Sequence, residues 1–294
     1  MLNITPMLAK GRALPREQTG LQVRYNQHMV LPALPSSIPV LVTGASSGIG
    51  AEFARQFAER GHDCTLVARR KDRLESLAGQ LAAAYGITAT TLTADLATPE
   101  GVDAVKKHIA TASAWIVVNN AGFGTSGPFS HAHIERDLEE IRLNVSALHA
   151  LTHAALVQNL PHRSGGIINV ASLAGFQPIP FMATYAATKA FVLHFTEAVA
   201  EENAGSGVRI MALCPGPVPT EFGTIAHAGP MFSQIPSLPV DQCVQLALRA
   251  FDRNRVICVP GNGPTVLSAL SRLAPRAVIR KSLGRVLKAG ISRG

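Results

Sequence analysis

Between residues 38 and 260, short apolar runs alternate with longer segments that have helical spacing. The first run, Ile38–Val42, precedes a segment in which Ile49, Phe53 and Phe57 recur every four residues. Further strand-like runs occupy residues 64–68, 88–92, 115–118, 166–170, 209–213 and 255–259. Strands that alternate with helices build βαβ units, whose parallel sheet is covered by helices on both faces. The pattern predicts one α/β domain with a doubly wound parallel sheet of about seven strands.

Composition supports a single large folded domain with two extensions. Hydrophobic residues make up 47% of the chain and charged residues 16%, so the chain can bury a sizeable core and global disorder is excluded. The net charge of +8 comes from the ends, because residues 264–294 hold seven basic residues and no acidic one. We therefore expect an N-terminal extension over 1–37, a folded α/β domain over 38–262 and a basic amphipathic tail over 263–294, with no nucleic-acid partner.

The cysteines bear on the cellular compartment. Cys64, Cys214, Cys243 and Cys258 show no paired spacing, which favours small buried residues in a reducing compartment over disulfides or a metal cluster. No run of 18 uncharged apolar residues is present to suggest a membrane-spanning helix. We expect a cytoplasmic protein without a bound metal.

A glycine-rich turn closes the first predicted strand, with the sequence T-G-A-S-S-G-I-G over residues 43–50. Such a turn lets the backbone approach a pyrophosphate, and the N–H groups of the helix that follows point at the anion. An ordinary strand-to-helix turn is the alternative, but the position after the first strand favours a dinucleotide. The candidate contacts here are Gly44, Ser46, Ser47, Gly48, Ile49 and Gly50.

The end of the second predicted strand indicates which dinucleotide binds. Arg69 stands where an acidic residue would bind the ribose hydroxyls of NAD, and no carboxylate follows before Asp72. A guanidinium group can hold a 2′-phosphate, so we predict NADP(H), with Arg69 as the main contact and Ser46 as a second. A solvated basic helix start is the alternative. Asp95 and Leu96 lie where an adenine ring would lie, although Asp95 could instead cap the following helix.

Further motifs follow in a fixed order. They are N-N-A-G at 119–122, Asn144, Ser172, Y-A-A-T-K at 185–189 and P-G-P-V-P-T at 215–220. Together with the glycine-rich turn, these motifs closely resemble those of the short-chain dehydrogenase/reductase family, in its NADP(H)-preferring type, over residues 38–260. The resemblance implies a Rossmann-type fold and an oxidoreductase.

The resemblance also implies roles for four residues. Tyr185 and Lys189 lie four apart on one helix face, and the ammonium group, with the oxidised cofactor, is expected to lower the tyrosine pKa. Tyr185 would then be the acid or base, and Lys189 would also bond the nicotinamide ribose. Ser172 would stabilise the substrate oxygen, and Asn144 would hold a water molecule in a proton relay.

Other family positions would complete the cofactor site. Val218 and Thr220 would fix the nicotinamide carboxamide, whereas Asn119 is expected to join adjacent strands. The remaining cofactor contacts implied by the resemblance are Asn120, Ala121, Gly122, Pro215 and Gly216, in addition to Tyr185 and Lys189.

The loops that would contact substrate, over 176–182 and 222–238, are mostly apolar and favour a small lipophilic carbonyl or alcohol. The basic tail leaves three alternatives open: a helix pair that covers the pocket or a subunit contact, a membrane-surface helix, and a nucleic-acid patch, which is the weakest of the three. The family is usually oligomeric, so we expect a homo-oligomer.

These observations predict an NADP(H)-dependent oxidoreductase that interconverts a carbonyl and a secondary alcohol. Two alternatives remain. A dinucleotide sensor would keep the fold without needing Tyr185 together with Ser172. An epimerase or dehydratase would use the same Tyr–Lys pair with a tightly held cofactor, although the glycine spacing disfavours it.

Overall fold

The computed structural model describes residues 34–226, 237–261 and 276–291. Within them, seven strands form one parallel sheet in the order β3-β2-β1-β4-β5-β6-β7. The strands are β1 (Val40–Thr43), β2 (Cys64–Ala68), β3 (Ala89–Thr93), β4 (Ile116–Asn119), β5 (Gly166–Val170), β6 (Arg209–Leu213) and β7 (Ile257–Cys258). This topology confirms the predicted doubly wound α/β fold, and most strand boundaries differ from the expected ones by one or two residues.

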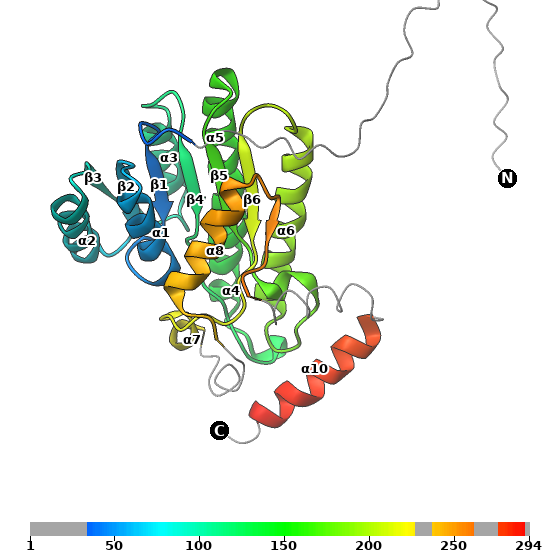
Figure 1. The fold of residues 1–294 in the computed structure, drawn as a ribbon. Coiled ribbons are helices and arrows are strands. Elements are labelled where there is room, and N and C mark those ends of the chain that lie inside the picture. The colour runs from blue at the N-terminus through cyan, green and yellow to red at the C-terminus, as the bar shows by residue number, and fades with distance from the viewer. Residues whose placement is uncertain (1–33, 227–236, 262–275, 292–294) are drawn as a thin grey trace, which may run out of the picture.

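Helices cover both faces of this sheet (Figure 1). The α-helices are α1 (Gly48–Glu59), α2 (Lys71–Tyr85), α3 (Pro99–Ile109), α4 (Ile134–Ile141), α5 (Leu148–His162), α6 (Ala183–Glu202), α7 (Phe222–Ile225), α8 (Val240–Asp252) and α10 (Arg276–Ile291). The shorter helical segments are the 3-10 turns η1 (Phe129–His131) and η3 (Leu173–Phe176) and the π-helical segment η2 (Arg142–Ala147).

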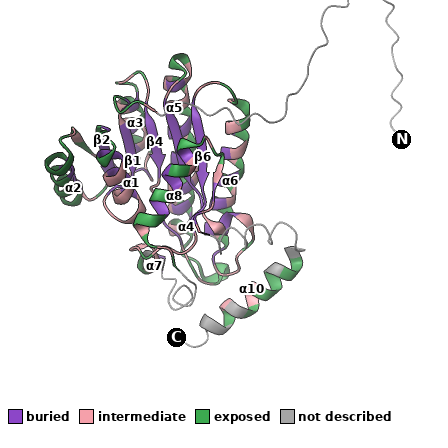
Figure 2. Cartoon of the chain, viewed as in Figure 1, coloured by how far each residue is buried: buried purple, intermediate pink, exposed green. Residues whose placement is uncertain are grey.

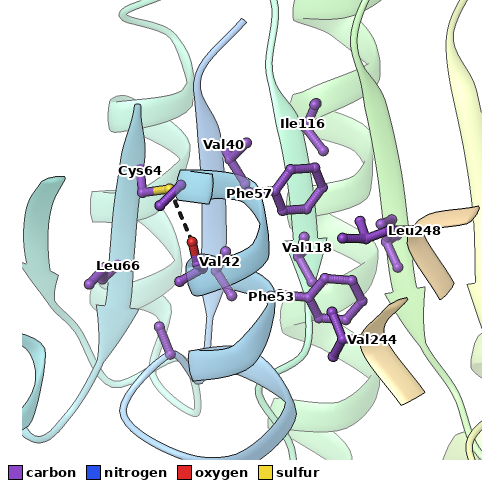
Figure 3. Packing of buried hydrophobic residues seen from close by; sticks show 14 of the residues in the cluster. Val40, Val42, Phe53, Phe57, Cys64, Leu66, Ile116, Val118, Val244 and Leu248 are labelled. Carbon is purple, nitrogen blue, oxygen red and sulfur yellow. Dashed lines mark hydrogen bonds between the residues drawn. The ribbon is translucent and has the colours of Figure 1, made fainter. Parts of the chain in front are cut away.

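Alternation along the strands divides the core into two layers. In β1, Val40 and Val42 pack in the layer that contains the side chains of α1, α2 and α8. Leu41, between them, packs in the opposite layer with residues of α3 and α5. Figure 2 shows the central strands β1, β4 and β6 as buried, and Figure 3 shows Phe53 and Phe57 of α1 among the strand side chains of the first layer. The central strands β1, β4, β5 and β6 are therefore covered on both faces, which explains their nearly continuous apolar sequence, whereas the edge strand β3 is partly exposed and mostly threonine.

The order of the strands locates the site. Strand β1 pairs with β2 on one side and with β4 on the other, so the direction of the crossovers reverses between β1 and β4. Ligands of open α/β sheets bind outside the carboxyl ends of the strands at such a switch point. The loops after β1, β4, β5 and β6 all begin at this edge and carry most of the motifs found in the sequence, whereas Asn144 lies in η2 and Tyr185 and Lys189 lie on α6.

Several expectations concern segments outside the described residues. They include the N-terminal extension up to residue 33, residues 227–236 of the apolar loop, and residues 262–275 of the tail. The described part of the tail forms α10, which Figure 1 shows at the same end of the sheet as α4 and α7. A Cβ atom added at Gly284 of α10 would lie 3.6 Å from Pro180 Cγ, so this helix adjoins the loop before α6.

Candidate active site

The glycine-rich turn is held tightly against the loop after β4. Gly44 has a φ of +66°, and a Cβ atom there would lie 2.8 Å from Asn120 Nδ2. A Cβ at Gly50 would clash with both the Gly44 oxygen and Asn120 Nδ2. Only glycine permits both this backbone conformation and this approach. The buried Thr43 hydroxyl adds to the junction, because it accepts hydrogen bonds from the backbone N–H groups of Asn120 (2.9 Å) and Ala121 (3.0 Å).

The helix that follows the turn begins without a side-chain cap. Ser47 is its N-cap residue, yet its side chain makes no capping hydrogen bond, and the first turn of α1 holds no acidic residue. The first N–H groups of a helix carry a partial positive charge and need acceptors. Gly48, at the helix start, lies beside Thr220 from the loop after β6, because an added Cβ would approach Thr220 Cγ2 to 3.0 Å. The helix start and the P-G-P-V-P-T segment thus share one site.

Arg70, the residue after the predicted phosphate contact Arg69, contacts the glycine-rich turn. Arg70 donates hydrogen bonds to Ser46 Oγ at 2.8 Å and 3.1 Å and to Ser47 Oγ at 2.8 Å. Arg69 instead lies near two carboxylates, with Nη1 3.5 Å from Glu139 and 3.9 Å from Asp95. The two arginines diverge because they follow β2 in succession, and residues that succeed one another in extended backbone point to opposite sides.

Arg70 also shares a carboxylate with Arg73 of α2. Arg73 Nη1 lies 2.6 Å from Glu221 Oε1, and Arg70 Nη1 lies 2.8 Å from Glu221 Oε2. The hydrogen bond from Arg73, followed by that from Arg70, lowers the pKa of Glu221 to about 2. Glu221 immediately follows Thr220, so this ion pair connects the segment after β6 to the end of β2. Sequence reasoning missed it, since no spacing relates residues so far apart.

The predicted adenine contacts lie at the end of β3. Leu96 is buried in the core, and Asp95 Oδ1 accepts a hydrogen bond from the Ala97 N–H at 3.0 Å. The N-cap of α3 is Thr98, whose hydroxyl accepts from the Gly101 N–H at 3.1 Å. The alternative role for Asp95 as a helix cap is therefore wrong, because Thr98 fills that position.

The four residues assigned to chemistry converge at the ends of β4 and β5. Tyr185 and Lys189 both lie on α6 and are buried, with Lys189 Nζ 5.8 Å from the centre of the tyrosine ring. Lys189 Nζ donates a 2.8 Å hydrogen bond to the Val170 carbonyl, at the end of β5. Ser172 follows two residues later, and its hydrogen bond with Tyr185 favours the tyrosinate. The Ser172 hydroxyl and the Tyr185 phenol therefore lie together, with the Lys189 ammonium group near the tyrosine ring.

Asn144 lies in the π-helical segment η2 between α4 and α5. Its side chain donates to the Phe123 carbonyl (2.8 Å) and to Thr188 Oγ1 (3.1 Å), and it accepts from the Phe123 N–H (3.2 Å). Asn144 is buried, so it is not a solvated helix asparagine. π-Helical turns often mark functional positions. A Cβ added at Gly122 would lie 2.8 Å from Asn144 Oδ1 and 3.5 Å from Lys189 Nζ, which places asparagine and lysine together.

Burial sets the ionisation of the pair on α6. Burial raises the pKa of Tyr185 to about 12, although the Ser172 hydrogen bond opposes this shift and the Glu140 charge adds to it. Burial also lowers the pKa of Lys189 to about 8, against the raising effect of Glu140. In the chain without cofactor, burial outweighs the hydrogen bond from Ser172, so the phenol is the favoured form of Tyr185. The expected lowering of the tyrosine pKa by Lys189 together with the oxidised cofactor stays a prediction.

The remaining predicted residues have mainly structural surroundings. Asn119 joins strands as expected, since its Nδ2 donates to Asn169 Oδ1 of β5 at 2.8 Å. The Pro215 carbonyl accepts from the Leu173 N–H at 3.0 Å, which connects the loops after β5 and β6. Gly216 and Val218 follow in the same partly buried segment. The four cysteines are all buried. Among the described residues, no three His, Cys, Asp or Glu side chains gather to hold a metal, and no helix is long and apolar enough to cross a membrane.

Comparison with known proteins identifies the family. The family model described as short chain dehydrogenase matches residues 39–228. The chain belongs to the short-chain dehydrogenase family. A very-long-chain 3-oxoacyl-CoA reductase of Anas platyrhynchos is 29% identical over 191 residues, which cover 63% of this chain and 61% of that protein. The chain thus matches only about three fifths of the length of this relative.

Two solved structures resemble the chain. A short-chain dehydrogenase from Sphingobium yanoikuyae in complex with NADPH is 38% identical, with a TM-score of 0.72, and the match covers 76% of this chain and 87% of that one. A bulky-bulky ketone specific alcohol dehydrogenase from Comamonas testosteroni is 30% identical, with a TM-score of 0.70, over 81% of this chain and 94% of the other.

Proposed function

We propose that the chain is an NADP(H)-dependent oxidoreductase that interconverts a carbonyl and a secondary alcohol on a mostly apolar substrate. The observation that supports this most strongly is the convergence of Tyr185, Ser172, Lys189 and Asn144 at the ends of β4 and β5, next to the switch point of the sheet. A proton donor, a second hydrogen-bond donor and a cation beside one position are what carbonyl reduction requires.

The residues around the glycine-rich turn fit a dinucleotide. A pyrophosphate can approach the backbone at Gly44 and Gly50, because these positions carry no side chain. It would accept hydrogen bonds from the uncapped start of α1, after Ser47. Arg70, with Ser46, is the group that we assign to a 2′-phosphate, and Val218 and Thr220 would hold the nicotinamide end. The complex of the Sphingobium yanoikuyae relative with NADPH supports this choice. The bound cofactor supplies or accepts the hydride.

Tyr185 is the proton donor in this scheme. With its pKa raised to about 12, the phenol stays protonated at neutral pH, which is the form that reduction of a carbonyl needs. Ser172 donates a hydrogen bond to the same substrate oxygen as negative charge develops on it. Lys189, held by the Val170 carbonyl, keeps a positive charge beside the phenol and favours the phenolate that remains after proton transfer.

The surroundings of Tyr185 suit a lipophilic substrate. Its ring lies 5.2 Å from that of Phe222, centre to centre, and Met182 and Ala174 are buried with it. Ile179 packs against the same cluster. These side chains offer apolar contacts and no charge that could hold a carboxylate or phosphate. The name of the Comamonas testosteroni relative, specific for bulky-bulky ketones, agrees with this proposal.

Two partner proposals follow from exposed elements. We propose that α10, which adjoins Pro180, covers the substrate side of the site, in preference to a role at a membrane surface.

We also propose self-association through α5 and α6, where Val157 and Phe191 are 54% and 40% exposed. Light scattering of the full chain and of Phe191→Glu tests the second proposal, with a loss of oligomer expected in the variant.

The function is tested by following product formation from a panel of lipophilic ketones and alcohols, with NADPH and NADH compared side by side. We expect oxidation of NADPH that depends on a ketone and is faster than oxidation of NADH. NADPH binding without turnover of any compound would instead favour a dinucleotide sensor. Turnover without net redox change, by protein that copurifies with its cofactor, would favour an epimerase or dehydratase.

A further inference from the structure

A buried carboxyl group lies beside the four converging residues and has no role in the reaction described above. The side chain of Glu140, on α4, is fully buried. Its Oε2 accepts a 2.7 Å hydrogen bond from Thr125 Oγ1, and the Thr125 backbone N–H also bonds to the carboxyl group. Within the described part of the chain, Oε1 is buried and has no hydrogen-bond partner. A buried carboxylate oxygen without a partner is costly, so its retention needs an explanation.

The charged groups around Glu140 belong to the active site. Helix α4 packs against α6, which carries Lys189 and Tyr185. The negative charge of Glu140 raises the pKa of both residues. On α4 itself, Asp137 is buried and accepts a 2.7 Å hydrogen bond from Thr184 Oγ1. Arg142, on the adjoining π-helical segment, is exposed. Lys189 is thus a buried cation whose charge favours the ionised form of Glu140, and the nearby Asp137 charge opposes it.

Glu140 also fixes the loop that contacts the tyrosine ring. Thr125 follows Gly124, and a Cβ added at Gly124 would lie 2.9 Å from Tyr185 Cδ2 and 3.0 Å from Phe222 Cζ. This contact leaves no room for the loop to move toward the ring. The hydrogen bonds between Thr125 and Glu140 therefore hold the segment after β4 against one side of the ring.

We propose that Glu140 is a positioning residue of the active site, which holds the Thr125 loop against Tyr185 and supplies a buried negative charge that controls the protonation of Tyr185 and Lys189. This inference rests on the proposed reaction for its consequences in catalysis. It adds an ionisable group on the protein side of the site that the four converging residues do not include.

The ionisation of Glu140 supports this role. Burial raises the pKa of Glu140 to about 7, although the hydrogen bonds from Thr125 oppose the shift. The group therefore changes its charge in the pH range where enzymes usually work. When Glu140 is ionised, its charge favours the ammonium form of Lys189 and disfavours the phenolate form of Tyr185.

The first test is the pH dependence of turnover for Glu140→Gln in the full chain. Glutamine keeps the size and can still accept from Thr125, but it carries no charge. Loss of a negative charge lowers both neighbouring pKa values, so the limbs of the profiles for reduction and oxidation should both move to lower pH by about one unit. A purely structural role would reduce kcat at every pH without changing the pH values at which kcat rises and falls. If those pH values were the same in Glu140→Gln and in the unmodified chain, the proposal would be overturned.

The matched control is Glu135→Gln, the same substitution at an exposed position of the same helix. It should leave the profile unchanged.

A second variant, Thr125→Val, removes the hydroxyl donor but keeps the carboxyl group. Because the Thr125 bond lowers the pKa of Glu140, this variant should make Glu140 neutral up to a higher pH. Near neutral pH, the pH profile of kcat for Thr125→Val should therefore move toward lower pH, as expected for Glu140→Gln.

A second measurement does not need turnover. A carboxyl group whose folded-state pKa exceeds its unfolded value of 4.5 stabilises the fold in acid, and this contribution is lost as pH rises through about 7. The thermal midpoint of Glu140→Gln should therefore rise relative to the unmodified chain between about pH 5 and about pH 8. If the thermal midpoints of Glu140→Gln and of the unmodified chain differed by the same amount at every pH, the inference about Glu140 would be overturned. Failure of the unmodified chain to turn over any substrate would instead count against the proposed function.

Discussion

Two glutamates at the carboxyl ends of the sheet occupy opposite environments. Glu140 is fully buried, and burial raises its pKa to about 7. Glu221 is 41% exposed, and hydrogen bonds from Arg73 and Arg70 lower its pKa to about 2. The first belongs to the cluster around Tyr185, and the second lies at the position that we assign to the cofactor phosphate. The comparison separates a cluster governed by desolvation from one governed by hydrogen bonds and charge.

The difference has consequences for function. In the buried cluster, water cannot screen the charges, so one carboxylate changes the proton affinity of several neighbours. In the exposed cluster, solvent and salt weaken each ion pair, so Glu221 can be displaced by a more highly charged anion. We therefore expect changes in the buried cluster to alter the chemical step and changes in the exposed cluster to alter cofactor affinity.

The largest effect is expected for Tyr185→Phe, which removes the proton donor but keeps the ring that packs against Phe222. Loss of a general acid typically lowers the rate by about 10²–10⁴-fold, so kcat should fall by this amount while NADPH affinity changes little. Tyr85→Phe, at the exposed end of α2, is the matched control. A kcat close to that of the unmodified chain would contradict the role of Tyr185.

The next largest effect is expected for Arg70→Ala. Loss of a charge-assisted bond to a phosphate costs about 1.5–3 kcal/mol, which corresponds to a rise in the KM for NADPH of about 10- to 160-fold. The KM for NADH should not change, since NADH lacks the 2′-phosphate. Lys71→Ala removes a neighbouring exposed charge and serves as control. If Arg69→Ala gave the larger loss, the expectation from the sequence would be right and the assignment to Arg70 wrong.

A smaller effect of opposite sign is expected for Glu221→Gln. This substitution frees both arginines from a carboxylate that would compete with the phosphate. An exposed ion pair contributes about 0.2–1 kcal/mol, so the KM for NADPH should fall by up to about five-fold. Glu75→Gln, which affects only an exposed pair with Lys71, is the control. An increase in KM would show that Glu221 orients the arginines and does not compete.

The smallest effect concerns salt. The Debye length falls from about 10 Å at 0.1 M to about 3 Å at 1 M, so salt should weaken the contact of Arg70 with a phosphate. The KM for NADPH should therefore rise a few-fold over this range, while the pH at which kcat changes should stay constant. A salt-dependent shift in that pH would mean that solvent ions reach the cluster around Glu140.

Local sequence patterns predicted much of this protein. The apolar runs and helical repeats predicted the parallel sheet, because strands that are covered on both faces must be apolar along their length. The glycine-rich turn required no knowledge of distant residues, since Gly44 and Gly50 mark positions that admit no side chain. The spacing of Tyr185 and Lys189 placed both on one helix face, as a helix of 3.6 residues per turn dictates.

Contacts between distant segments were decided only by the tertiary structure. Whether Arg69 or Arg70 contacts Ser46 depends on how the chain leaves β2, and the partners of Arg70 include a residue 151 positions away. The spacing of four residues between Glu140 and Asn144 could have indicated that both lie on the same face of a helix. The spacing does not show that this face is buried against α6. Sequence fixes the local backbone and its periodicity. Burial and charge at a site depend on packing between elements, and packing sets the desolvation that moved the pKa values of Tyr185, Lys189 and Glu140.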